Sequence, residues 1–133
     1  MQSNYKLFNW ILAGVVILMF CYSGFYGKQS SAPIVCQYEQ RTGQVCPTCG
    51  FTRSFGFLLS GDWESARVMN PLGVAVFSFF CIELLLRLGI NAGLSSIKSQ
   101  RSLYWLLAFD IIQALGLFLW AFIPVIRQVQ SFA

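Results

Sequence analysis

The sequence predicts an all-α integral membrane protein with three transmembrane helices and a re-entrant or interfacial helical hairpin between the first and second spans. The chain has 133 residues, of which 56% are hydrophobic and only 11% are charged, against about 25% charged in a typical soluble domain. It contains three apolar runs near the ~20 residues that a helix needs to cross a bilayer. A short chain cannot hide so much apolar surface from water, so we expect residues 1–133 to form one membrane domain.

The first predicted span covers residues 7–27. Lys6 precedes it, as the basic residues of a signal peptide precede an apolar run. The run is too long for a signal peptide, however, and no A-x-A-like cleavage site follows it. We therefore expect a retained span, in which Ala13, Gly14 and Gly24 allow a neighbouring helix to approach closely.

A polar, turn-rich loop over residues 28–45 leads to a predicted hairpin over residues 46–70. Cys46 is expected to cap its first helix and Pro47 to open it, since a proline at the first helical position loses no hydrogen bond. The apolar stretch that follows, residues 51–60, has about half of the ~20 residues that a span needs.

Two turn signals divide the hairpin and end it. Gly61 is expected to end the first short helix, and Asp62 to cap a second one over residues 63–69. Asn70 stops that helix because the residue before a proline disfavours the helical conformation. Pro71 is then expected to open the second span.

The second and third predicted spans cover residues 71–90 and 103–126 and are joined by a short polar loop. They should therefore be antiparallel neighbours. Each carries an acidic residue seven positions from the loop end of its span, Glu83 in the second and Asp110 in the third. At ~1.5 Å per residue both acids lie roughly 10 Å inside the bilayer.

Because an unpaired charge in lipid costs at least a few kcal/mol, we expect Glu83, Asp110, Arg87 and Gln113 to face one another. One arginine does not balance two carboxylates, so either one acid is protonated, or it pairs with Arg101 or with a partner protein. The cluster is then a polar clamp between helices or, alternatively, part of a proton or ion path.

Positive charges near the span ends indicate the orientation. One side carries Lys6, Arg87, Lys98 and Arg101, and the other carries Lys28, Arg41, Arg53, Arg67 and Arg127. The counts are nearly equal, but short loops weigh most, which favours a cytoplasmic N-terminus and an extracytoplasmic cysteine loop. The formal charge of +4 is scattered without a basic block, so we expect lipid rather than nucleic acid as the partner.

Cys46 and Cys49 form a C-x-x-C pair with three possible uses. The first is a dithiol–disulfide couple, with Cys36 as a possible third thiol, although no thioredoxin-like βαβ pattern surrounds it. The second is half of a metal site, but such sites usually have four ligands and this chain has no histidine, so we expect no metal and no cofactor. The third is structural: the motif fixes a chain reversal.

The ordered pieces C-P-T-C-G-F-T-R, G-D and N-P-L resemble a bacterial membrane-protein family of unknown function, domain-of-unknown-function family 2752. The resemblance covers about residues 36–90. It implies a small protein of the bacterial inner membrane and supplies no reaction. The positions that match the family pattern are Cys46, Pro47, Cys49, Gly50, Thr52, Arg53, Gly61, Asp62, Asn70 and Pro71.

These observations leave three functional hypotheses. The first is a non-enzymatic accessory or assembly subunit that holds another membrane protein, or a second copy of itself, through Glu83, Asp110 and the hairpin. The second is a membrane thiol–disulfide oxidoreductase that uses Cys46 and Cys49. A weaker third is a protein that handles lipids or ions. Within the hairpin, Arg53 is expected to pair with Asp62 or to bind an anionic group such as a lipid phosphate.

Overall fold

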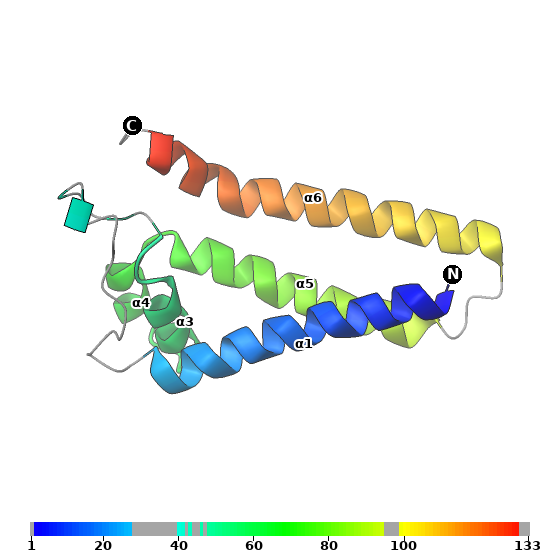
Figure 1. The fold of residues 1–133 in the computed structure, drawn as a ribbon, viewed down its shortest axis with the longest axis horizontal. Coiled ribbons are helices and arrows are strands. Elements are labelled where there is room, and N and C mark those ends of the chain that lie inside the picture. The colour runs from blue at the N-terminus through cyan, green and yellow to red at the C-terminus, as the bar shows by residue number, and fades with distance from the viewer. Residues whose placement is uncertain are drawn as a thin grey trace.

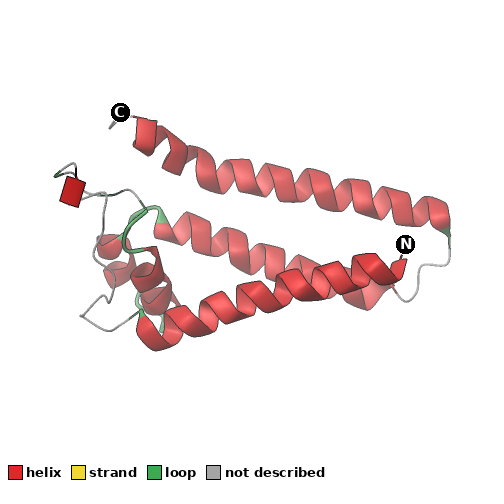
Figure 2. Ribbon diagram, viewed as in Figure 1, coloured by secondary structure: helices red, strands yellow, loops and turns green. Residues whose placement is uncertain are grey.

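The computed structural model describes residues 2–27, 40–41, 43, 46, 48–94 and 99–130. The described residues form helices joined by turns and loops and include no strand, as Figure 2 shows. The helices are α1 (Gln2–Tyr26), α3 (Phe51–Leu59), α4 (Trp63–Met69), α5 (Gly73–Leu94) and α6 (Gln100–Gln130).

Three of these helices, α1, α5 and α6, are long and apolar enough to cross a membrane. The predicted all-α fold with three spans is therefore confirmed, and the protein is a multi-pass membrane protein. Each helix is longer than predicted at one end or both, since backbone hydrogen bonding continues into the polar residues that flank the apolar run. The hairpin between the first two spans is formed by α3 and α4, and its re-entry into the bilayer stays a prediction.

Both ends of the bundle are visible in Figure 1. The start of α1, the end of α5 and the start of α6 lie at one end, and the hairpin lies at the other, near the end of α6. α1 packs against α3 and α5, whereas α6 packs on α5. The hairpin therefore closes one end of the bundle, while α1 and α6 flank α5 along its length.

The buried apolar core lies at the hairpin end. Phe55 of α3 is its centre: its ring meets that of Phe77 edge-on at 5.4 Å between centroids and lies 6.3 Å from that of Phe20. Such edge-to-face aromatic pairs add about 1 kcal/mol each to the burial of their rings. The hairpin is therefore held to α1 and α5 by a layer of phenylalanines.

Two glycines bring α1 and α3 into backbone contact. A Cβ added to Gly56 would lie 2.7 Å from the carbonyl oxygen of Ser23 and 3.0 Å from Cα of Gly27. The glycines that the sequence indicated are different: Gly14 meets nothing within 4 Å, and Gly24 meets only a side-chain carbon of Leu59 at 3.6 Å. Ala13, the third small residue that the sequence indicated, is 1% exposed inside the bundle. The backbone contact of α1 with α3, however, is made at Gly27, which the sequence did not indicate.

The predicted start of the hairpin is wrong. α3 begins at Phe51, with Gly50 as its cap at φ 87°, and Cys46 lies before a turn in which the Cys49 N–H donates to the Cys46 carbonyl at 3.2 Å. The reason is that Gly50 adopts the left-handed conformation at little cost, so the chain turns once more before the helix starts. Pro47 itself lies outside the described residues.

The predicted turn between the two short helices is confirmed. Gly61 has φ 81°, and its N–H donates to the Leu58 carbonyl at 3.0 Å while the Asp62 N–H donates to the Phe57 carbonyl at 3.0 Å. This pair of bonds is the Schellman ending of a helix. The Asp62 carboxylate then caps α4 by accepting from the Ser65 N–H at 3.0 Å.

Candidate functional site

The cysteine turn, which comprises Cys46 and residues 48–50, lies at the hairpin end. Cys46, Cys49 and Gly50 are half-buried, and Thr48 is exposed. The Cys46 sulfur lies 3.3 Å from the Thr48 hydroxyl oxygen, and Cys46 and Cys49 are both free thiols. Burial raises the pKa of the Cys46 thiol, but hydrogen bonds from Thr48 and Cys49 outweigh it and lower the pKa from 9.0 to about 7. A large share of Cys46 is therefore the nucleophilic thiolate at neutral pH. Cys36 lies outside the described residues.

Asn70 joins the cysteine turn to the second span. Its side-chain N–H donates to the Cys49 carbonyl at 3.0 Å, and its Oδ1 accepts from the Leu72 N–H at 2.9 Å. Asn70 is buried, and Gly50 packs so closely that an added Cβ would lie 2.7 Å from the Met69 carbonyl oxygen. Two motif pieces that are far apart in sequence thus meet through the Asn70 side chain, which bonds the Cys49 backbone, and through the close packing of Gly50 on the Met69 backbone.

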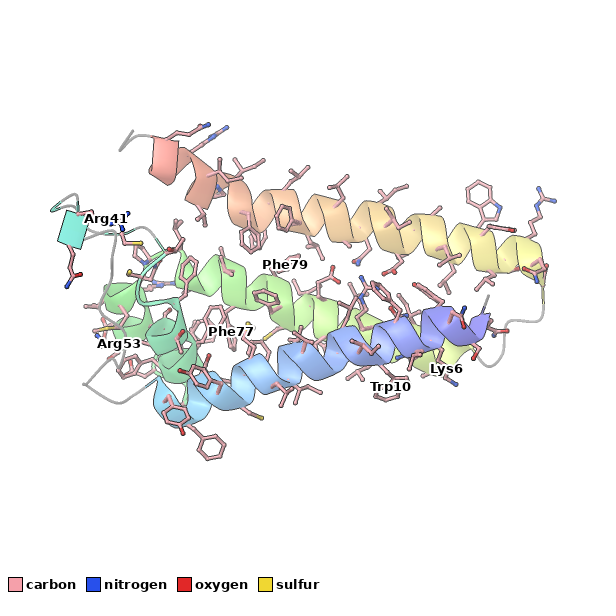
Figure 3. The ribbon with its side chains drawn as sticks, viewed as in Figure 1. Lys6, Trp10, Arg41, Arg53, Phe77 and Phe79 are labelled. Atoms are coloured by element: carbon pink, nitrogen blue, oxygen red, sulfur yellow. The ribbon has the colours of Figure 1, made fainter. Side chains whose placement is uncertain are left out.

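The remaining motif residues lie around this junction. Pro71 is in the turn before α5 and does not open that helix, which begins at Gly73. The Gly73 N–H closes the turn on the Asn70 carbonyl at 3.0 Å, and the first helical bond runs from the Val76 N–H to the Leu72 carbonyl at 3.2 Å. Thr52 is exposed, and Arg53 is half-buried at the hairpin end (Figure 3). The pairing of Arg53 with Asp62 stays a prediction.

The intramembrane polar residues come together around Arg87. Its guanidinium donates to Asp110 at 2.7 Å from Nη1 to Oδ2, and to Glu83 at 3.3 Å from Nη2 to Oε2. Gln113 donates to the other oxygen of Glu83 at 3.1 Å. Both carboxylates are buried, Glu83 at 8% exposure and Asp110 at 3%. One guanidinium thus bridges α5 and α6, while Arg101 is exposed and forms no ion pair within the described part of the chain.

The first helix also enters this cluster, which the sequence did not predict. The Tyr5 hydroxyl donates to Asp110 Oδ2 at 2.6 Å, and Asn9 Oδ1 accepts from Arg87 Nη1 at 2.8 Å. Gln2 donates to the Leu94 carbonyl nearby. The sequence feature that could have indicated this contact is Asn9, a polar residue in an otherwise apolar run. Three helices are therefore tied together at one depth.

A cavity of about 650 Å³ lies beside the cluster, between α1, α5 and α6. Its polar groups are Tyr5, Glu83, Arg87 and Asp110, and its other walls are apolar. Phe79 is one of these walls and lies between α5 and α6 in Figure 3. This is the larger of the described concave sites, and it lies away from the cysteine turn, so the chain has two separate candidate sites.

Comparison with known protein families finds a similarity over the part of the chain that carries the cysteine motif. Neither the curated proteins nor the solved structures contain a match to this chain. One family model matches the segment that carries the cysteine turn, the hairpin and the first half of α5. Over residues 36–84, the chain is similar to the family described as "Protein of unknown function (DUF2752)".

Proposed function

We propose that this protein is a non-enzymatic accessory or assembly subunit of a membrane complex. The supporting observation is that the motif residues are used to build the hairpin. Asn70 bonds the Cys49 carbonyl and the Leu72 N–H, Gly50 accommodates a close carbonyl, and Asp62 caps a helix. Each of these contacts is made to backbone, so the motif sets the shape of the hairpin rather than presenting several reactive groups to a substrate.

The contact with the partner is assigned to the exposed apolar side chains of the hairpin. Trp63 is 53% exposed and Val68 is 76% exposed on α4. Large apolar residues that are exposed on a short helix beside the spans are typical of contact with protein or lipid. Glu83 and Asp110, which the sequence also offered for this contact, are instead held inside the bundle by Arg87.

The proposed location is the bacterial inner membrane, with the N-terminus in the cytoplasm and the cysteine turn outside. The start of α1 and the start of α6 share one end of the bundle (Figure 1), and Lys6 and Arg101 belong to these two helix starts. A membrane-impermeant maleimide should label Cys46 in intact cells if this orientation is correct. Labelling of Cys46 only after the membrane is permeabilised would indicate the opposite orientation.

The experiment for the accessory role is purification of a tagged chain in mild detergent, followed by measurement of the mass of the complex. A stoichiometric partner, or a defined oligomer of the chain itself, is expected. The double variant Trp63→Ser/Val68→Ser should lose it. Trp105→Ala, which alters a residue 70% exposed on α6, is the matched control and should keep it. A monomer both in mild detergent and after cross-linking in native membranes would overturn the proposal.

A second function, thiol–disulfide exchange, is favoured by the Cys46 pKa of about 7. The Cys46 thiolate would attack a substrate disulfide, form a mixed disulfide and release one substrate thiolate. The Cys49 thiolate would then attack the Cys46 sulfur and release the second substrate thiolate. Two electrons pass to the substrate, and the pair becomes a disulfide.

The two functions predict different results for the substitutions Cys46→Ser and Cys49→Ser. In exchange chemistry, Cys49→Ser traps a mixed disulfide through Cys46 that dithiothreitol releases, and Cys46→Ser traps none. In the accessory role neither variant traps one, and both keep the partner, because the Asn70 bond goes to the Cys49 backbone. Non-reducing electrophoresis with mass spectrometry of the trapped species separates these results.

A further inference from the structure

The cavity between α1, α5 and α6 has the size of a small-molecule site. Its volume of about 650 Å³ falls within the roughly 300–1,000 Å³ of ligand pockets. Its walls are mainly aliphatic and aromatic side chains, among them Leu12, Val16, Phe79, Leu115 and Phe118. An occupant must therefore be apolar over most of its length.

The length of the cavity follows from the helices that line it. The lining runs from Tyr5 to Val16 on α1 and from Leu107 to Phe118 on α6. At ~1.5 Å per residue, both stretches are roughly 16 Å long, about half of the ~30 Å hydrocarbon core of a bilayer. A membrane-spanning helix is too long for this space, whereas a single alkyl chain fits it.

The polar end of the cavity has an unbalanced charge. The two carboxylates of Glu83 and Asp110 share one guanidinium, that of Arg87. In addition, Asp110 Oδ1 is buried and has no hydrogen-bond partner within the described residues. A charge without a counter-ion in the membrane interior costs at least a few kcal/mol. This end therefore lacks one positively charged hydrogen-bond donor.

We propose that this cavity binds a linear amphiphile that has one alkyl chain and a small, positively charged amino head. The ammonium lies at the polar end of the cavity beside the Asp110 and Glu83 carboxylates and supplies the missing charge, and the chain extends towards Phe79 and Phe118. A phosphate or carboxylate head would add a third negative charge to the cluster, so anionic lipids are excluded. The site is independent of the accessory role proposed above, which uses the hairpin.

The test uses the full chain reconstituted in phosphatidylcholine vesicles with photoactivatable dodecylamine, dodecanol and dodecanoic acid. Mass spectrometry identifies the labelled residues. We expect dodecylamine to label the cavity walls on α1 and α6 at least ten times more strongly than either of the other two probes. Asp110→Asn should remove this preference, because it removes the charge but keeps the shape of the side chain.

Two further variants separate binding from folding. Val16→Trp places a large side chain in the cavity about two turns away from Asn9, the nearest cluster residue on α1, and it should abolish labelling. Ile112→Trp makes the same addition at a residue that is 70% exposed on α6 and outside the cavity, and labelling should be unchanged. Equal labelling by amine and alcohol, or full labelling of Val16→Trp, would overturn the proposal. So would a co-purified protein whose own side chain occupies the cavity and blocks the amine.

Discussion

The hairpin end and the polar cluster are held together by two different kinds of helix contact. At the hairpin, helices touch through backbone: Gly56 lies against Gly27 and the Ser23 carbonyl, with no room for a methyl group. At the cluster, the helices stand further apart around a cavity, and charged side chains reach across. The difference shows that a membrane bundle with little hydrophobic driving force between helices has two ways to associate, close packing of small residues and polar contacts.

Each region should therefore be sensitive to a different kind of substitution. Added volume should damage the hairpin end, while the cluster, beside its cavity, should tolerate volume but not a change in charge. The predictions below test this contrast by unfolding the purified protein in detergent and following tryptophan fluorescence.

Removal of the central charge should have the largest effect. Arg87→Met leaves Glu83 and Asp110 buried without a counter-ion, and we expect the free energy of unfolding to fall by about 3–5 kcal/mol. The triple variant that also carries Glu83→Gln and Asp110→Asn should regain most of this loss, because no buried charge remains. A loss below about 1 kcal/mol for Arg87→Met would mean that the ion pairs do not hold the spans together.

A methyl group at the hairpin contact should have the next largest effect. Gly56→Ala brings Cβ against two backbone atoms that cannot rotate away, and we expect a loss of about 2–3 kcal/mol. Gly116→Ala is the control, since an added Cβ there meets nothing within 4 Å. It should be neutral or should stabilise by up to ~1 kcal/mol through helix propensity. Equal effects at both positions would remove the contrast between the two regions.

Loss of the Asn70 side chain should cost about 2 kcal/mol, because two buried hydrogen bonds of roughly 1 kcal/mol each disappear. Asn70→Ala removes both of them. Asn70→Asp keeps the acceptor for the Leu72 N–H and loses the donor to the Cys49 carbonyl, so it should lose less than Asn70→Ala. If Asn70→Ala unfolds at the wild-type denaturant concentration, the junction between the turn and α5 is held by other contacts.

The smallest expected effect on stability is that of Thr48→Val, because Thr48 is exposed. Its effect on the pH dependence of Cys46 alkylation should be large enough to measure. In the wild type the rate of Cys46 alkylation by iodoacetamide should fall as pH falls through about 7, where the thiolate is protonated. Thr48→Val removes a hydrogen bond to the sulfur and should move this midpoint up towards 9.0. An unchanged midpoint would show that Thr48 does not set the pKa of Cys46.

The same pKa has a consequence for folding. A thiol whose pKa is lower in the folded than in the unfolded protein stabilises the fold at high pH, and the contribution is lost as pH falls. For Cys46 the change should occur between about 9 and about 7. Cys46→Ser removes the titrating group and should abolish this part of the pH dependence.

The spans and the hairpin were predictable because they depend on local signals. Run length separates a span from the nine residues of α3, and Gly61 with Asp62 encodes a turn. The meeting of Arg87 with Glu83 follows from their spacing of four residues on a helix. Its contact with Asp110 follows from the equal depth of the two acids.

The contributions of α1 were not predictable for a physical reason. In lipid, the side of a helix that faces the bundle is as apolar as the side that faces the bilayer, so hydropathy does not show how α1 is rotated. Tyr5 and Asn9 could not be assigned to the cluster, nor Gly27 to its contact with Gly56. The start of α3 was missed because a proline signal outweighed Gly50, whose left-handed conformation no local pattern indicated.

The arrangement of charge also implies an order of membrane insertion. Glu83 and Arg87 lie one turn apart on α5 and pair with each other, so this helix brings a counter-ion with its acid. α6 carries Asp110 in its apolar part and its arginines, Arg101 and Arg127, near its two ends, and an aspartate inside a span disfavours insertion by up to roughly 3 kcal/mol. Its counter-ion is already in place when α6 emerges, because α5 is made first. Arg87 of the second span can therefore neutralise Asp110 while the third span inserts into the bilayer.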